Sequence, residues 1–340
     1  MDLFLTSMES PKITVIVPVY NVATYIEKCA VSLFQQTLDS LEILFIDDCS
    51  PDNSVEIIKE TLKKYPARNS LTRIIRMPSN GGQAAVRRQG IIEATGQYII
   101  HCDGDDWVDL DLYERLYDVA VEKGADIVVC DEIHECYDGS HLQKVGLLPE
   151  HCKDVIKNWY KAALGMFCHN KLVKRSLYTE HDILPWVGLN MWEDNGLLAR
   201  LFYYGDKLAQ IHGSCYHYNR TNINAMTSGY GISQVEQMIG IAEHLTEFFS
   251  TKKDAKELER TVLAFQYLAR INFVTDSFAK LRRYNNTFKG SEAIIPYLDL
   301  NAFSNKGRFR FRMVKYHLGW LFVLMFKVKN LLSNRNLLKV

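Results

Sequence analysis

The chain has 340 residues, 47% of them hydrophobic, which supplies a sizeable core for one large α/β domain plus a smaller region and excludes an unfolded chain. Lysine plus arginine and aspartate plus glutamate both number 40, so the average charge argues neither for nor against nucleic acid. The eight cysteines form no CxxC pair, and several lie in apolar runs such as IVVCD. This usage predicts reduced thiols in a cytosol and argues against zinc.

The N-terminal stretch MDLFLTSMESPK lacks a basic segment followed by an apolar stretch of about seven residues, so no secretory signal is expected. The longest uncharged apolar stretch, from His317 to Phe326, is too short to span a bilayer. We therefore expect a cytoplasmic protein, or one bound peripherally to the inner face of the cell membrane.

The first predicted elements are strands separated by helices. Ile13 to Val17 is an apolar, β-branched run that predicts a buried strand entering a loop at Pro18. A second strand is expected at Ile43 to Asp47. The dipeptide Ser50-Pro51 predicts a helix start, because serine caps free N–H groups and proline suits the first turn. A third strand follows at about Thr72 to Met77.

The alternation continues as far as residue 131. After a turn at Asn80-Gly81-Gly82 we expect a helix to about Thr95, a strand at residues 97–102, a helix ending near Gly124 and a strand at residues 125–131. Five alternations with short connections predict a Rossmann-like α/β fold, with a mostly parallel sheet flanked by helices. In such sheets ligands bind beyond the carboxyl ends of the strands.

The second half of the sequence is less regular. Trp192 to Tyr204 predicts an amphipathic helix closed by Gly205, and about Lys207 to Tyr218 predicts one or two strands. Long helical patterns dominate from Ile232 to about Tyr284. A basic tail follows.

Asp103-Gly104-Asp105-Asp106 places three carboxylates in four residues, directly after an apolar strand. Their mutual repulsion favours a divalent cation, and Mg²⁺ or Mn²⁺ often takes only one or two protein carboxylates and leaves positions for phosphates. The structural alternative is an acidic turn that caps the helix beginning near Asp109.

Three motifs decide between these readings: ITVIVPVYN at 13–21, ILFIDDCSPDNS at 43–54 and NGGQAAVRRQGIIEATGQYIIHCDGDDW at 80–107. In this order and spacing they closely resemble family 2 of the glycosyltransferases, which has the GT-A fold. A weaker resemblance to the acceptor-side segments of bacterial surface-polysaccharide members continues through HNKLVKRSL (169–177), WEDNGLLARLFYYG (192–205) and YHYNRTNINAMT (216–227). The sequence departs from those members at Cys168-His169, where an aromatic residue commonly precedes the asparagine.

The resemblance implies a GT-A catalytic domain over residues 1–225, with a donor half at about 12–131 and an acceptor half at about 132–225. A helical region over 226–305 and a basic amphipathic tail over 306–340 follow it.

By the same resemblance, the first loop of the nucleotide pocket consists of Pro18, Val19, Tyr20 and Asn21. Asp48 is the carboxylate that recognises the base, and an acceptor carboxylate suits the imide N–H of uracil. The structural alternative for Asp47-Asp48 is a capping pair before a helix.

Arg87 matches the arginine after the family's double-glycine turn and is expected near the base or phosphates of an anionic donor. Asp103 is expected near the ribose and the metal, and Asp105 as the more direct metal ligand. Asp106 either orients a metal-bound water or caps the next helix.

Asp194 matches the aspartate of the family's ED pair and is therefore the expected catalytic base, with Glu193 shaping the acceptor or leaving-group side. Carboxylates at a helix N-terminus are also favoured by the helix dipole, which is the structural alternative. The isolated histidines His169, His212 and His217 are expected to have structural roles.

These assignments imply an inverting glycosyltransferase that uses Mn²⁺ or Mg²⁺. It would move a sugar from a nucleotide diphosphate donor, expected to be a UDP-sugar, to a hydroxyl of a glycan or lipid-linked oligosaccharide in cell-surface polysaccharide synthesis. No nucleic-acid partner is expected. The alternatives are a catalytically inactive nucleotide-sugar-binding protein of the same fold, against which Asp105 and Asp194 argue, and a nucleotidyltransferase. The latter would carry a glycine-rich basic loop after the first strand, and VPVYNVATY is neither.

The C-terminal tail has a one-sided charge. No acidic residue follows Asp299, whereas nine lysines and arginines do, and they surround the apolar segment 317–326. This combination resembles an interfacial anchor that meets anionic lipid. The alternative is a helix that packs Leu318, Leu321 and Met325 onto the catalytic domain.

Overall fold

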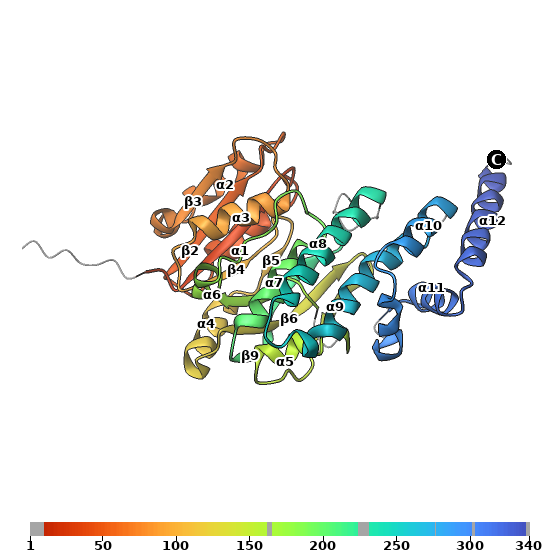
Figure 1. The fold of residues 1–340 in the computed structure, drawn as a ribbon. Helices are drawn as coiled ribbons and strands as arrows, with labels where there is room; N and C mark the ends of the chain where they lie inside the picture. Colours follow the sequence, from red (N-terminus) through yellow and green to blue (C-terminus); the bar gives the residue numbers. More distant parts are fainter. Residues whose placement is uncertain (1–9, 162–164, 224–230, 276, 301–302, 338–340) are drawn as a thin grey trace, which may run out of the picture. The chain divides into compact units, whose positions relative to one another are not determined.

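The computed structural model describes residues 10–161, 165–223, 231–275, 277–300 and 303–337, with side chains described as far as Lys329 (Figure 1). These residues fall into two compact units, each with its own hydrophobic core. The first lies within Met1–Asp154 and Met166–Ala225, and the second within Val155–Gly165 and Met226–Val340. The three-part division expected from the sequence stays a prediction.

The described part of the first unit is built on one nine-stranded sheet, in the order β3-β2-β1-β4-β8-β6-β9-β5 with β7 paired to β6. The strands are β1 (Ile13–Val19), β2 (Leu41–Asp47), β3 (Thr72–Arg76), β4 (Tyr98–His101), β5 (Trp107–Val108), β6 (Ile127–Cys136), β7 (Gly139–Gln143), β8 (Lys171–Lys174) and β9 (Leu208–Asn219).

Strands β1 to β4 form a parallel half-sheet whose carboxyl ends meet at one edge. Val19 of β1 lies opposite Asp47 of β2, and Ile16 of β1 lies opposite His101 of β4. The loops that follow β1, β2 and β4 are therefore neighbours in space, although they are far apart in the sequence.

The other half of the sheet is mixed, so the prediction of mostly parallel strands holds for β1 to β4 but not for the whole sheet. β8 is antiparallel to both β4 and β6, β6 is parallel to β9, and β5 and β7 add further antiparallel pairs. Strand–helix alternation predicts parallel neighbours only where a helix crosses over to the next strand. The short β8 instead enters the sheet between two earlier strands.

The α-helices within the first unit's ranges, with α5 bridging into the second unit, are α1 (Ile26–Phe34), α2 (Ser54–Lys63), α3 (Gln83–Glu93), α4 (Leu112–Lys123), α5 (Cys152–Lys157), α6 (Arg175–Glu180) and α7 (Glu193–Tyr204). They cover both faces of the sheet. Val15 of β1 lies in one core with Leu33 of α1 and Leu116 of α4. On the other face, a Cβ at Gly90 of α3 would lie 2.4 Å from Cγ2 of Ile16, so α3 packs directly on β1.

Two predicted boundaries differ from the structure. β1 continues through Pro18. On the side that faces β4, the last hydrogen bond runs from the Cys102 N–H to the Ile16 carbonyl, and β4 itself ends at His101. The missing N–H of Pro18 therefore costs no hydrogen bond between the strands. The helix predicted at Ser50-Pro51 begins at Ser54 instead. The Ser50 hydroxyl donates to the carbonyl of Val19 and so closes the loop after β2.

The α-helices described in the second unit are α8 (Ile232–Ser250), α9 (Ala255–Arg270), α10 (Phe278–Asn286), α11 (Asn305–Lys315) and α12 (Gly319–Leu337). Phe311 of α11 and Phe322 of α12 lie in its core, and Leu318 and Leu321 pack against that core, whereas Met325 is exposed. No described helix combines the length and the apolar character that crossing a bilayer requires.

Candidate active site

Polar side chains gather where the parallel strands end. The loop after β1 begins at Tyr20, the loop after β2 begins at Asp48, and the acidic elbow Asp103–Asp106 follows β4. Within this edge the Tyr20 ring is half exposed, whereas Pro18 is partly buried and Val19 fully buried.

Asp48 is buried and holds the double-glycine turn. Its two carboxylate oxygens accept the backbone N–H groups of Gly81 at 2.7 Å and Gly82 at 2.8 Å. Asn21 and Cys49 both have positive φ, so the loops after β1 and β2 each turn sharply at this edge. The structure therefore gives Asp48 a clear positioning role, and its expected contact with a base stays a prediction.

The three carboxylates of the acidic elbow have different partners. Asp106 is buried and accepts the Tyr216 hydroxyl at 2.5 Å and the Asn219 backbone N–H at 2.7 Å. Asp105 accepts the side-chain amide of Asn222 at 2.8 Å. These contacts give Asp106 a structural role and leave Asp103 and Asp105 as the partly exposed carboxylates of the elbow.

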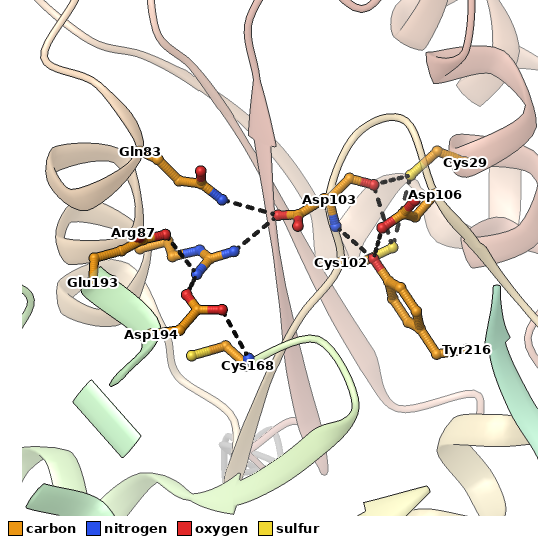
Figure 2. A network of polar contacts seen from close by, with 10 residues as sticks. All are labelled: Cys29, Gln83, Arg87, Cys102, Asp103, Asp106, Cys168, Glu193, Asp194 and Tyr216. Atoms are coloured by element: carbon orange, nitrogen blue, oxygen red, sulfur yellow. Dashed lines mark hydrogen bonds and ion pairs between the residues drawn. The ribbon is translucent and has the colours of Figure 1, made fainter. Parts of the chain in front are cut away.

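Arg87 of α3 lies at the centre of a buried ion cluster (Figure 2). Its guanidinium is 1% exposed and pairs with Asp103 at 3.0 Å, with Glu193 at 3.1 Å and with Asp194. Gln83, one helical turn earlier, donates to the same oxygen of Asp103 at 3.3 Å. The arginine expected to contact the donor thus joins the acidic elbow to the ED pair of α7, and its direct donor contact stays a prediction.

The packing of α3 against α7 depends on Gly82 and Asn190. The side-chain oxygen of Asn190 accepts the backbone N–H of Ala84 at 3.0 Å, in the first turn of α3. Gly82 has φ +77, and a Cβ there would lie 2.4 Å from the Asn190 side chain. The glycine is therefore required by close approach and not only by the turn.

Burial and charge set the protonation of this cluster. Burial alone would lower the pKa of Arg87, but the carboxylates of Asp103 and Glu193 outweigh it and raise this pKa. Burial raises the pKa of Glu193 to about 7, although Arg87 opposes the rise. Three carboxylates around one guanidinium leave an excess of negative charge, and the raised pKa of Glu193 favours its protonated form up to about pH 7.

Asp194 combines a buried anchor with access to solvent. One of its oxygens pairs with Arg87, and the other accepts the backbone N–H of Cys168 at 3.2 Å. Its side chain remains 16% exposed, more than that of Glu193 at 8%. Asp194 is therefore the carboxylate of the ED pair that faces outward.

A column of stacked rings runs beside Asp194. Phe167, which is 48% exposed, stacks on His169 with ring centroids 5.5 Å apart, and His169 stacks on Tyr216 at 4.3 Å. The buried Lys171 donates to the carbonyl of Phe167 at 2.9 Å and fixes the loop. Because Tyr216 also binds Asp106, the column connects an exposed aromatic ring to the acidic elbow.

Sequence reasoning missed several of these contacts. His169 was expected to have a structural role, and the structure packs its ring between those of Phe167 and Tyr216. Its place in this column beside the site was not expected. Asn219 and Asn222 lie in the segment 216–227 that resembles acceptor-side segments, and that resemblance was the available signal. Asn190 carried no signal, because its role depends on two helices meeting.

Asp103 and Asp105 fit a hard divalent cation. Oδ2 of Asp103 receives no hydrogen bond from the described residues, and both side chains offer the oxygen ligands that Mg²⁺ and Mn²⁺ prefer. Burial raises the pKa of Asp105 and the charge of Asp103 adds to the rise, while Asn222 opposes it. A nearby cation would relieve this repulsion.

The first unit supplies too few ligands here to enclose an ion. Among the described residues, the only group of three metal-ligating side chains close together is Cys136, Asp138 and His141 on the β6–β7 hairpin. A cation at Asp103 and Asp105 would therefore complete its shell with phosphate oxygens and water.

The chain is similar in sequence to known glycosyltransferases. Residues 14–181 match the model of the family described as glycosyl transferase family 2. Residues 14–181 form a domain of this family. It is 28% identical over 264 residues to the putative glycosyltransferase EpsH of Bacillus subtilis, covering 76% of this chain and 75% of that protein.

Solved glycosyltransferases have the same fold as this enzyme. The Staphylococcus aureus protein TarS, in complex with UDP-GlcNAc, matches with a TM-score of 0.69 and 18% identity over 90% of each chain. The mannosyltransferase PcManGT of Pyrobaculum calidifontis, in complex with GDP-Man and Mn²⁺, matches with a TM-score of 0.51 and 15% identity over 95% of this chain and 88% of that chain. The present chain therefore has the GT-A fold, and its sheet is mixed rather than wholly parallel.

Proposed function

We propose that this glycosyltransferase is metal-dependent and inverting, and that it moves a sugar from a UDP-sugar to a hydroxyl of a glycan or lipid-linked oligosaccharide. The observation that carries the proposal is the Arg87 cluster. One guanidinium holds Asp103, at the elbow that suits a metal and a diphosphate, and Asp194, the outward-facing carboxylate. A base and a leaving-group site are thereby fixed relative to each other.

The donor would lie over the edge formed by the ends of β1, β2 and β4. The half-exposed ring of Tyr20 offers a face for stacking, and Pro18, Val19 and Asn21 shape the loop around it. Each oxygen of Asp48 accepts one glycine N–H and retains a second lone pair, which suits the imide N–H of uracil. TarS in complex with UDP-GlcNAc supports a uridine donor.

Asp103 and Asp105 would hold Mn²⁺ or Mg²⁺ together with the diphosphate. The cation supplies charge stabilisation of the departing nucleotide without a proton donor. Arg87 and Gln83 fix the position of one oxygen of Asp103, which leaves the other to face the cation. The complex of PcManGT with Mn²⁺ supports this choice of metal.

Asp194 would accept the proton of the acceptor hydroxyl as that oxygen forms its bond to the anomeric carbon and the bond to the diphosphate breaks. Its contacts with Arg87 and Cys168 orient the carboxylate. A single displacement with one base on the face opposite the leaving group inverts the configuration. General-base assistance of this kind contributes about 10²–10⁴ in rate.

The acceptor would approach along Phe167. This exposed ring lies next to Asp194, because the residue after Phe167, Cys168, donates its backbone N–H to the Asp194 carboxylate. An aromatic face suits the C–H face of a sugar ring. A glycan or lipid-linked acceptor of cell-surface polysaccharide synthesis would place the enzyme at the inner face of the cell membrane, where the basic tail predicts a peripheral contact.

The proposal is tested by screening UDP- and GDP-sugars for donor hydrolysis with Mn²⁺, with Mg²⁺ and with chelator. We expect one UDP-sugar to be hydrolysed only when a divalent cation is present. The variant Asp105→Asn should lose this activity together with the metal-dependent stabilisation by UDP.

The matched variant Asp106→Asn should instead lower thermal stability, because Asp106 binds Tyr216 and Asn219, while keeping metal-dependent UDP binding. Full turnover in chelator, or in Asp105→Asn, would reject the metal assignment. Binding of donors without turnover of any of them would favour an inactive sugar-nucleotide-binding protein.

A further inference from the structure

Helix α12 carries a second apolar face that the described residues of its own unit leave exposed. Phe322 faces the core of the second unit, and Phe326 packs against that core. Trp320, Leu324 and Val328 are spaced by four residues, so they form a stripe along another face. Trp320 is 49% exposed and Val328 is 54% exposed. Such a stripe is unusual on a described helix that is already anchored by its opposite face.

Lysines lie on both sides of this stripe. Lys327 precedes Val328 and Lys329 follows it, so at about 100° per residue the two lysines lie on opposite sides of Val328. An open hollow of about 490 Å³ extends along the same face and is lined by Leu321, Leu324, Met325, Val328 and Lys329. An apolar stripe accompanied by cations is the arrangement of a helix that lies in the boundary of a bilayer.

The surrounding charge has one sign. Among the described residues, neither Lys327 nor Lys329 forms a salt bridge, and the same holds for the exposed Arg312 and Lys315 of α11. No acidic residue follows Asp299 in the sequence. A second copy of this chain would bring a like-charged face against the stripe, whereas an anionic surface would be complementary to it.

We propose that the Trp320–Leu324–Val328 stripe of α12, with Lys327 and Lys329 on its flanks, is the surface by which the protein binds an anionic phospholipid bilayer. This inference rests on the proposed peripheral location and assigns it to one helix face. The ring and aliphatic side chains enter the headgroup boundary, and the two lysines meet lipid phosphates. The core-facing side of α12 keeps the helix attached to the second unit.

The geometry sets the size of the expected effect. Each basic residue at such a surface contributes about 1 kcal/mol, so neutralising Lys327 and Lys329 should weaken binding by about 25-fold. Removing the whole tail would be a poor test, because Phe311 and Phe322 are part of the core of the second unit. Point variants of exposed residues avoid this loss of packing.

The test is co-sedimentation of the full chain with vesicles of phosphatidylcholine containing about one-third phosphatidylglycerol, at low and high salt, and with pure phosphatidylcholine vesicles. The variants are Lys327→Gln with Lys329→Gln, and Leu324→Ser with Val328→Ser. Matched controls change exposed residues of the first unit in the same way: Lys59→Gln with Lys123→Gln, and Ile92→Ser with Val121→Ser.

We expect salt-sensitive binding to the anionic vesicles, a loss of about 25-fold in the lysine variant, a clear loss in the serine variant, and no loss in either control. Negligible binding of the wild-type chain, or equal losses in variants and controls, would overturn the proposal. A dimer in solution that the serine variant abolishes would assign the stripe to a second copy instead. Donor hydrolysis without vesicles is measured in parallel, so that failure of the glycosyltransferase proposal and failure of the membrane surface remain distinguishable.

Discussion

At the scale of single residues, Arg87 determines the geometry of the site. Its guanidinium is buried among Asp103, Glu193 and Asp194, and a planar fork of donors can bind several carboxylates at once. Burying these charges costs desolvation free energy, and the attraction between them offsets that free energy only while every partner is present. The cluster is therefore sensitive to the removal of its one cation.

Replacing Arg87 with methionine should lower the free energy of unfolding by about 3–5 kcal/mol and abolish turnover, because three carboxylates would remain close together without a cation. Urea unfolding and donor hydrolysis check this. The neighbouring Arg88 forms no salt bridge among the described residues, and Arg88→Met should change stability by less than about 0.5 kcal/mol. Equal effects of the two variants would show that the cluster does not stabilise the fold.

Glu193 makes the stability depend on pH. Its folded-state pKa is raised to about 7 from the ordinary 4.5, so the folded protein binds more protons than the unfolded chain within this window. Its contribution to the free energy of unfolding is therefore fully present below pH 4.5 and is lost as the pH rises through about 7.

In Glu193→Gln this loss should be absent, so the variant gains stability relative to the wild type as the pH rises between 4.5 and 7. Urea titrations of both proteins at several pH values give the difference directly, and other titrating groups cancel in it. A difference that does not change with pH would mean that folding leaves the pKa of Glu193 unshifted.

Part of this site could be predicted from the sequence. The motifs identify Asp103, Asp105 and Asp194 as candidates, because each stands in a short segment whose neighbours carry the resemblance. They do not predict that Arg87 joins the acidic elbow to the ED pair, since Arg87 and Asp194 are 107 positions apart and meet only through the packing of two helices. The sequence also left two roles open for Asp106, orienting a metal-bound water or a structural one. Its contacts with Tyr216 and Asn219 favour the structural role.

At the scale of elements, the site depends on how the N-terminal turn of α3 meets the segment before α7. Gly82 combines φ +77 with ψ 173, a region of backbone conformation that is essentially restricted to glycine. Asn190 fills the space that a side chain at Gly82 would need, and it holds the first turn of α3 through Ala84. This contact between Gly82 and Asn190 fixes the rotation of α3, and thereby the direction in which Gln83 and Arg87 point toward Asp103.

Gly82→Ala should therefore cost about 1–3 kcal/mol of stability and reduce turnover, because α3 and Asn190 must move apart. Gly124→Ala is the matched control, since Gly124 also has positive φ but lies in the left-handed helical region with nothing within 4 Å of a Cβ. That control should cost about 1 kcal/mol and leave turnover unchanged. If Gly82→Ala behaves like the control in both measurements, the close approach to Asn190 is not required.

The elements themselves were predictable where strand and helix alternate. The strands at 43–47 and 72–77 and the helix closed by Gly205 appear close to their expected positions. Local pattern could not predict the antiparallel β8, because four residues show no clear period and their place between β4 and β6 is set by long-range pairing.

At the scale of the whole molecule, the chain combines a glycosyltransferase unit with a helical unit that ends in a basic segment. The first unit contains every residue of the candidate site. The second keeps α12 on its core by one face and exposes the Trp320 stripe on another. The sequence predicted an apolar, basic tail but not which of its faces packs. The structure distinguishes the two faces, because Phe322 is buried whereas Trp320 is half exposed.

The role of Asp194 as the base of a metal-dependent displacement can be measured by comparing Asp194→Asn with the wild type in Mn²⁺-dependent donor hydrolysis and in UDP affinity. The single acceptor oxygen of the amide can keep the hydrogen bond from Arg87 and gives up the one from Cys168, and the amide cannot take up a proton from the attacking hydroxyl or water. Turnover should fall by about 10²–10⁴ with UDP affinity almost unchanged. Normal turnover in the variant would contradict this role and would leave Asp194 as a carboxylate that only stabilises the start of α7.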